Sequence, residues 1–209
     1  MELLEQIKSR IEAAVPGAKI EVVQNGSSSQ QHSLLIDNEH AVAIARFLRV
    51  DLALRLDFCS NVTGVDWLDR VVKKTTKVKK VVDGVEKEVD ETVEKKRPGY
   101  LEAVYYLYSM ELEHVPFVLR QRTVNRSDQT AIASLTPVWR GCEFQEREIF
   151  DLYGVMFEGH PDLRRILMWD GFKDFPMRKD YEEPDDYEWE PTPHDDVLKK
   201  AKEHYPTRA

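Results

Sequence analysis

The sequence has few of the residues on which common catalytic and cofactor sites are built. Only two of its 209 residues are cysteines, Cys59 and Cys142, so neither a disulfide framework nor a four-thiolate cluster can be assembled. We expect two reduced, buried thiols, with a disulfide or a shared metal as the alternatives. The nine glycines form no phosphate-binding loop, and the sequence contains no HExxH motif or nucleophile elbow.

Long apolar runs and an excess of positive charge are also absent. No stretch of about 18 apolar residues occurs, so the sequence predicts no membrane-spanning helix. Lysine and arginine total 30 against 38 acidic residues, and this net charge of −8 disfavours a general nucleic-acid-binding role. The first residues lack the pattern of a secretory signal or transit peptide, which predicts a cytoplasmic location. Hydrophobic residues make up 42% of the chain, enough for a folded core.

Hydrophobic spacing predicts an α+β fold with a mostly antiparallel sheet and flanking helices. Apolar residues three and four apart predict helices over 3–15 and 39–49, the second capped by Asp37 or Asn38. Strand-forming residues recur in hairpin-like order rather than as repeating βαβ units. The predicted strands cover residues 19–23, 33–36, 54–65, 100–111 and 116–124.

Two further helices complete the predicted core domain, which we place at residues 1–155. The first is expected over 129–135, after a cap at Ser127 or Asp128. The second is expected to open at Thr136-Pro137 and to run to about Tyr153. Gly154 is then placed for a left-handed C-cap.

Residues 70–99 have a different composition from the rest of this domain. Six bases and no acid lie between Arg70 and Lys80, whereas six acids and one base lie between Asp83 and Glu94. Valines interrupt both runs, and Asp83-Gly84 is a hairpin turn signal. We predict a two-stranded hairpin whose basic and acidic strands pair. A basic contact patch for an acidic partner and a nucleic-acid-binding arm are the alternatives.

The remaining residues, 156–209, are predicted to form an elbow followed by an extended tail. Nine acids and no base lie between Asp180 and Asp196, and half of the ten prolines lie between Pro176 and Pro206. Such a composition does not build a core of its own. The tail nevertheless contains Tyr181, Tyr187 and Trp189, which favours docking onto partner subunits over folding back onto the chain's own domain.

The stretch from Phe144 to Leu167 combines several groups that could carry chemistry. Glu146, Glu148, Asp151 and His160 could serve a small metal-dependent enzyme as ligands or as an acid–base pair. The spacing disfavours that reading, because Glu146 and Asp151 are five residues apart on a helix and His160 lies beyond a turn. We favour a hydrogen-bonded elbow with buried charges paired at a subunit contact. An ordinary solvated helix face is the third reading.

This stretch resembles the signature of the C-subunit family of respiratory complex I, called the 30-kilodalton subunit in mitochondria. The constrained positions of the signature are occupied by Glu146-Arg147-Glu148, Asp151, Leu152-Tyr153, His160, Arg164 and Ile166-Leu167. Residues 158–167 and 175–181 also look like the family, so the resemblance covers Val138 to Tyr181. The residues that we assign to the family signature and a subunit interface are Glu146, Arg147, Glu148, Asp151, Gly154, Gly159, His160, Pro161, Arg164, Arg165, Arg178, Lys179, Asp180 and Tyr181.

The resemblance implies a cofactor-free structural and assembly subunit of a proton-pumping NADH:quinone oxidoreductase. It implies a place in the peripheral arm, at the cytoplasmic face of the bacterial inner membrane. The 49-kilodalton-type quinone-site subunit and the subunit carrying the terminal iron–sulfur cluster would be neighbours. FMN, iron–sulfur clusters and quinone are expected in partner subunits, and no catalytic centre is expected in this chain. The alternative is the equivalent subunit of a related membrane-bound hydrogenase or of a ferredoxin or quinone oxidoreductase.

Four arginines of the resembling stretch are expected to contact carboxylates of the partner subunits. They are Arg147, Arg164, Arg165 and Arg178. A guanidinium binds a carboxylate through two parallel hydrogen bonds, which makes arginine the usual choice for such contacts.

Overall fold

The computed structural model describes residues 4–29, 31–82, 85–113, 116–169 and 171–182. The chain divides into two compact units, Met1–Lys179 and Asp180–Ala209. The first unit therefore extends beyond the boundary that we predicted after residue 155. The reason is that residues 156–169 and 171–179, which we call the post-helix segment, are hydrogen-bonded to the predicted core domain. The predicted docking of Tyr187 and Trp189 onto a partner lies outside the described residues.

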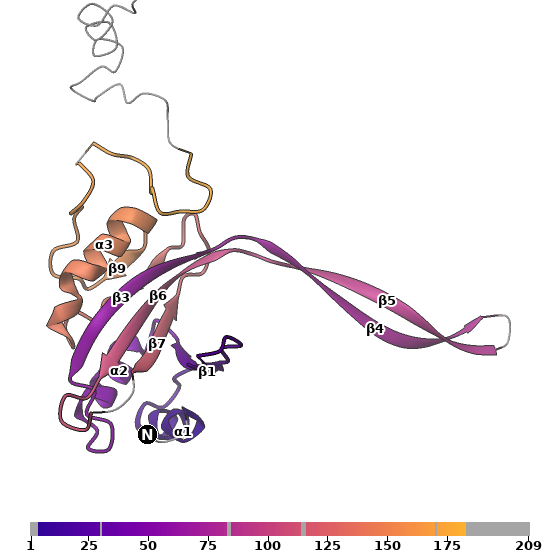
Figure 1. The fold of residues 1–209 in the computed structure, drawn as a ribbon, viewed down its shortest axis with the longest axis horizontal. Helices are drawn as coiled ribbons and strands as arrows, with labels where there is room; N and C mark the ends of the chain where they lie inside the picture. The colour runs from indigo at the N-terminus through magenta and orange to yellow at the C-terminus, as the bar shows by residue number, and fades with distance from the viewer. Residues whose placement is uncertain (1–3, 30, 83–84, 114–115, 170, 183–209) are drawn as a thin grey trace, which may run out of the picture. The chain divides into compact units, whose positions relative to one another are not determined.

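A five-stranded sheet forms the centre of the first unit (Figure 1). Its strands, in spatial order, are β1 (Ile20–Val23), β2 (Ser33–Ile36), β7 (Phe117–Arg122), β6 (Tyr100–Tyr108) and β3 (Phe58–Trp67). Three of the four pairings are antiparallel, and only β2 and β7 run parallel. The predicted α+β fold with a mostly antiparallel sheet is therefore confirmed.

Three helices cover one face of this sheet. They are α1 (Leu4–Ala14), α2 (Ala41–Val50) and α3 (Glu143–Tyr153). Buried residues of all three helices join one hydrophobic cluster with alternate residues of β6, namely Leu101, Ala103, Tyr105 and Leu107. Val104 is also buried but stands outside this cluster, because successive strand residues point to opposite faces. The sheet thus has a helix-covered face and a second face without helices among the described residues.

The predicted helix over 129–135 is wrong. The structure has a short strand there, β8 (Ala131–Ala133), which pairs in parallel with β9 (Met156–Glu158). Ile132 is buried between two more exposed alanines, the alternation of a strand. Three residues are too few for periodicity to separate a strand from a helix, so the partner strand decides.

The next predicted helix begins seven residues later than expected, at Glu143 instead of Thr136. A 3-10 turn, η1 (Arg140–Cys142), precedes α3. Trp139 has an extended backbone, and its indole N–H donates to the carbonyl oxygen of Leu56 at 2.7 Å. This buried tertiary contact holds the segment before Arg140 out of the helix.

Two smaller predictions near α2 also need correction. Neither Asp37 nor Asn38 caps the helix, because His40 occupies the N-cap position without a side-chain cap. The Asp37 carboxylate instead bonds the His40 ring at 2.5 Å, and the Asn38 amide donates to the Arg122 carbonyl oxygen. The strand predicted from Leu54 begins only at Phe58.

The charged region forms the two-stranded hairpin that its composition predicts. Strand β4 (Arg70–Val82) pairs antiparallel with β5 (Val85–Arg97). The register sets basic residues against acidic ones at several positions, as at Lys79 and Glu88, although Arg70 faces Arg97 and Lys80 faces Lys87. The predicted turn at 83–84 lies outside the described residues. Within the part of the chain that is described, no helix is long and apolar enough to cross a bilayer.

Gly64 of β3 allows α3 to approach the sheet closely. A Cβ atom at this position would lie 2.6 Å from the Tyr153 ring of α3. We therefore expect Gly64→Ala to lower the free energy of unfolding by about 1–3 kcal/mol, because the ring must shift within a packed interior. Gly26→Ala is the matched control, since a Cβ atom there would have nothing within 4 Å. Equal urea midpoints for the two variants would contradict this account.

Candidate functional site

Glu146 of α3 is fully buried and connects this helix to the sheet and to the loop after β8. Its carboxylate accepts hydrogen bonds from the Leu135 amide at 2.8 Å and from the hydroxyls of Ser134 and Thr136 at 2.5 and 3.0 Å. The Tyr105 hydroxyl of β6 donates at 3.1 Å. Burial raises the pKa of Glu146, although these donors favour its charged form. Four donors thus occupy the carboxylate as a structural junction.

Asp151, five residues further along α3, is also fully buried and binds the post-helix segment. One of its oxygens accepts the backbone amides of Ile166, Leu167 and Met168 at 3.0, 2.7 and 2.9 Å. The other accepts the Arg165 guanidinium at 2.6 Å. Burial opposes the charged form of Asp151, but the three amides and the guanidinium outweigh it and lower the pKa. One ionised carboxylate therefore fixes four consecutive residues.

Arg147 lies between these two acids in sequence, and its side chain is almost fully buried. It donates from Nε to the carbonyl oxygen of Arg164 at 3.2 Å and from a terminal nitrogen to that of Arg165 at 3.4 Å. Its guanidinium also lies 3.7 Å from the Asp162 carboxylate. Arg147 and Asp151 are thus four residues apart on one helical stripe, and both hold residues 162–168.

His160 and two glycines shape the turn that follows α3. Gly154 ends the helix in the left-handed conformation, with φ 76° and ψ 29°, which confirms the predicted C-cap. Gly159 also has a positive φ of 80°, and Pro161 follows His160. The Nδ1 atom of His160 accepts the Asp162 amide at 3.1 Å, so Nε2 carries the proton toward the Glu143 carbonyl oxygen at 3.0 Å. The histidine therefore ties the turn to the start of α3.

The end of the first unit is held by contacts that join distant parts of the sequence. Arg178 donates to the Tyr153 carbonyl oxygen at 2.7 Å, and the Lys179 amide donates to Asp66 at 2.9 Å. Asp66 is buried and pairs with Arg126 through two hydrogen bonds of 2.6 and 2.7 Å. The sequence did not predict the roles of Asp66 and Arg126. Asp66 binds Arg126 and Lys179, which are 60 and 113 positions away, and no local pattern marks contacts of that range.

The structure brings Arg147, Asp151 and Arg165 into one hydrogen-bonded network around residues 162–168, whereas Glu146 bonds β6 and the loop after β8. Glu148 is exposed on α3, and Arg164 is largely exposed and pairs with Asp162 at 2.9 Å. Asp180 and Tyr181 belong to the second unit. The donors of Arg147 and Arg165 engage groups of this chain, so their contacts to partner carboxylates, like those of Arg164 and Arg178, stay predictions. The predicted elbow is present as a hydrogen-bonded structure, and its role at a subunit contact also stays a prediction.

The structure does not bring Glu146 and Asp151 together as ligands of one metal ion. Glu146 faces β6 and the loop after β8, whereas Asp151 faces the post-helix segment. In the described ranges, the one trio of acids and histidine whose ligand atoms lie within 4.8 Å of one another is Asp37, Glu39 and His40, before α2.

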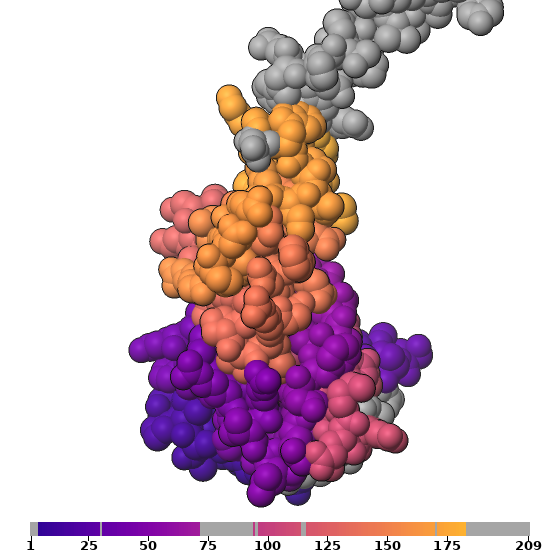
Figure 2. Space-filling model, turned by 90° about the vertical axis from the view of Figure 1, so that its left-hand side faces the viewer, coloured from indigo at the N-terminus to yellow at the C-terminus, as the bar shows by residue number. Residues whose placement is uncertain are grey.

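Several large apolar side chains of α3 and of the chain that follows it are exposed, and Figure 2 shows this part of the chain in orange. We call this set the apolar ledge: Phe144, Met156, Ile166, Leu167, Trp169 and Met177. Leu167 is 57% exposed although Asp151 fixes its backbone amide. Large apolar side chains held rigidly at a surface are typical of protein–protein contacts.

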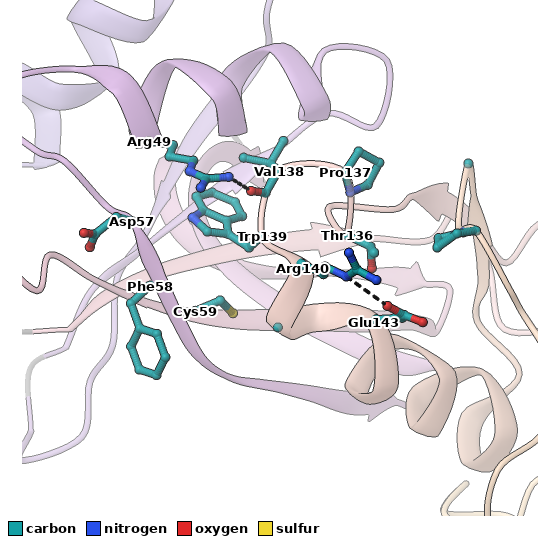
Figure 3. Close-up of a pocket in the computed structure, with 13 residues that line it drawn as sticks. Arg49, Asp57, Phe58, Cys59, Thr136, Pro137, Val138, Trp139, Arg140 and Glu143 are labelled. Carbon is teal, nitrogen blue, oxygen red and sulfur yellow. Dashed lines mark hydrogen bonds and ion pairs between the residues drawn. The ribbon is translucent and has the colours of Figure 1, made fainter.

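A cavity of about 760 Å³ lies between the end of α2, the start of β3 and the segment 136–143 (Figure 3). Arg49 donates to the Val138 carbonyl oxygen at its wall, and Arg140 lies 3.9 Å from Glu143. Cys59 lines this cavity, and both cysteines are free and buried. A hydrogen bond with Cys59, together with burial, raises the pKa of the Cys142 thiol, which disfavours a nucleophilic role.

The Asp151 carboxylate can be tested by Asp151→Asn, which keeps the shape and removes the charge. We expect the free energy of unfolding to fall by about 3–5 kcal/mol, because the largely buried Arg165 guanidinium loses its ion-pair partner. Amide hydrogen exchange at Ile166, Leu167 and Met168 should accelerate more than exchange in β6. Glu148→Gln, on the exposed side of the same helix, is the matched control and should change neither quantity. Unchanged exchange at the three amides would refute the anchoring role.

The two buried acids of α3 predict opposite pH dependences. The pKa of Asp151 is lowered on folding, so its stabilisation is present above its unfolded pKa of about 3.9 and is lost as pH falls through the folded value. The pKa of Glu146 is raised, so its contribution is present below about pH 4.3 and is lost as pH rises through the folded value.

Urea unfolding at a series of pH values can measure this contrast. The stability advantage of the native chain over Asp151→Asn should shrink on acidification below about pH 4. Its advantage over Glu146→Gln should shrink as pH rises above about 4.3. Slopes of the same sign for the two variants would contradict these assignments.

Comparison with known proteins identifies the family of this chain. Residues 34–187 match the family described as respiratory-chain NADH dehydrogenase, 30 Kd subunit. The C 2 subunit of NADH-quinone oxidoreductase from Rhizobium meliloti (strain 1021) is 33% identical over 170 residues, which are 80% of this chain and 76% of that protein. The C subunit of NADH-quinone oxidoreductase from Roseiflexus castenholzii (strain DSM 13941 / HLO8) is 34% identical over 176 residues, 83% of this chain and 81% of the relative.

A solved structure has a similar fold. It is a chain of the membrane-bound sulfane sulfur reductase, an archaeal respiratory membrane complex. The TM-score is 0.54 at 20% identity, over 98% of this chain and 92% of that chain. From the sequence matches, this chain belongs to the 30-kilodalton subunit family of respiratory-chain NADH dehydrogenase.

Proposed function

We propose that this chain is a cofactor-free positioning subunit in the peripheral arm of a proton-pumping NADH:quinone oxidoreductase. Its relatives are named as subunits of NADH-quinone oxidoreductase, an enzyme complex. The chain's own part in that enzyme is to hold neighbouring subunits in place. FMN, iron–sulfur clusters and quinone belong to those neighbours.

The observation that carries the proposal is the apolar ledge held by a buried charge network. Asp151, Arg147 and Glu146 are engaged inside the chain, so they act as internal supports. What they support is a surface on which Leu167 and its neighbours stay exposed. Apolar side chains that are pre-ordered before binding lose little conformational entropy on docking, which favours a permanent contact.

The proposed neighbours are the 49-kilodalton-type quinone-site subunit and the subunit that carries the terminal iron–sulfur cluster. Electron transfer between clusters depends on fixed separations, so a subunit that locks the cluster-bearing chains can affect the rate without binding an electron carrier. We place the subunit peripherally, at the cytoplasmic face of the bacterial inner membrane, attached through the complex. The acidic residues after Lys179 would extend the contact onto the partners.

Assembly in cells tests the proposal. A tagged chain replaces the native copy, and the proteins that co-purify are identified by mass spectrometry. We expect Leu167→Asp to reduce recovery of the partner subunits at least tenfold, because a carboxylate is buried in an apolar contact. Leu52→Asp is the matched control, since Leu52 is 83% exposed and outside the ledge. It should assemble like the native chain.

A truncation after Lys179 tests the part of the proposal that concerns the acidic residues. It removes the second unit and leaves the first intact. We expect it to assemble poorly although it folds, as judged by circular dichroism. Normal incorporation of both this truncation and Leu167→Asp would overturn the positioning role. Co-purification with hydrogenase or ferredoxin-linked subunits would favour the alternative complex. Stoichiometric bound metal that is lost on His160→Ala would favour a small metal-dependent enzyme.

A further inference from the structure

The face of the sheet opposite the three helices contains a second feature that the proposed function does not use. A cavity of about 460 Å³ opens there, beside the base of the β4–β5 hairpin. Its walls include four arginines, Arg70, Arg97, Arg120 and Arg122, and two aromatic side chains, Trp67 and Tyr100. The register places Trp67 directly opposite Tyr100, and their ring centroids are 6.2 Å apart.

Glu102 forms a rigid floor for this cavity, which we call the arginine pocket. It is only 1% exposed, although it lies on the helix-free face. One of its oxygens accepts the Arg122 guanidinium at 2.7 and 3.0 Å. The other accepts Arg120 at 3.1 Å and the indole N–H of Trp67 at 2.6 Å. These bonds fix two guanidinium groups and an indole in place before any ligand arrives.

Glu102 does not neutralise the positive charges of Arg70 and Arg97. They lie directly opposite each other in the first pair of the hairpin ladder, and both are exposed. Like charges in directly opposed positions destabilise a strand pair. Among the described residues, neither arginine has an ion-pair partner. An anionic ligand bound between Arg70 and Arg97 would relieve the repulsion between their two positive charges.

The surrounding groups add to the positive potential. Four arginines line the pocket against two glutamates, Glu21 and Glu102, and Glu102 is already bound by Arg120 and Arg122. The ammonium group of Lys179 lies 5.7 Å from the Trp67 ring. The Arg122 guanidinium lies 4.1 Å over the Tyr100 ring, so an arginine and an aromatic surface are presented together.

We propose that the arginine pocket is a docking site for an acidic, aromatic-containing peptide segment of a partner protein. Exposed guanidinium groups at the rim suit carboxylates, because each can form two parallel hydrogen bonds. Trp67 and Tyr100 suit a neighbouring aromatic side chain. The pocket is a surface separate from the apolar ledge, and its occupant is recognised by charge rather than by apolar area.

Peptide binding to the full-length chain tests this assignment. The probe is a labelled peptide of about twelve residues, rich in glutamate and aspartate, with one tyrosine. We expect fluorescence anisotropy to give a Kd of about 10–100 μM at low salt that weakens as salt is added. Arg70→Glu combined with Arg97→Glu should weaken binding at least tenfold. Arg140→Glu is the matched control, because its side chain is 93% exposed and lies outside the pocket, and it should leave Kd within about twofold.

A single substitution separates a ligand-binding role from a structural one. Arg97→Thr removes one of the opposed charges and inserts a good strand former. We expect the unfolding temperature to stay equal or to rise while peptide affinity falls severalfold. A lower unfolding temperature with unchanged affinity would overturn the proposal.

Two further probes separate the peptide from other anions. Inorganic phosphate and vesicles that contain phosphatidylserine are tested with the same variants. Weak binding of both, less dependent on Arg70 and Arg97 than that of the peptide, supports the peptide assignment. Absence of peptide binding, or vesicle binding with the same arginine dependence in its place, overturns it.

Discussion

The buried carboxylate of Asp151 is the constraint on which the rest of the site depends. An ionised group without partners would be strongly destabilising in the interior, so it must be surrounded by donors. Three consecutive amides and Arg165 meet this requirement, and they can do so only if the chain turns back after Gly154. The requirement of one charge therefore dictates the path of the post-helix segment and the position of the apolar ledge.

Two further charged residues of α3 also hold neighbouring segments in place. Glu146 fixes the helix to the sheet, and Arg147 binds the carbonyl oxygens of Arg164 and Arg165, next to the amides that Asp151 binds. Donors and acceptors of one short segment are thereby satisfied from a single helix. A segment without regular structure gains a fixed conformation in this way. The signature charges act through the backbone that they hold, and a partner need not contact them directly.

Local patterns in the sequence predicted those features that depend on residues close together in the chain. The stripe that Arg147 and Asp151 share and the C-cap at Gly154 follow from helical spacing, and the α+β sheet follows from alternation and turn residues. The Tyr105–Glu146 and Asp66–Lys179 contacts could not be predicted, because they join residues 41 and 113 positions apart. The error at Ala131–Ala133 has the same origin, since that strand exists through its pairing with β9.

The net charge of the chain also has a different meaning once its distribution is known. The segment from Asp180 to Asp196 has a net charge of −9, and the whole chain has −8, so the rest of the chain has a net charge of +1. Within that nearly neutral remainder, acids are buried as internal supports at Glu102, Glu146 and Asp151, whereas guanidinium groups stay at the surface around the arginine pocket. Glu102, buried beneath the arginines of the pocket, leaves that surface positive although the chain as a whole is acidic. In the two contacts that we propose, apolar area at the ledge would supply affinity for one neighbour, and the exposed guanidinium groups would supply orientation and selectivity for another.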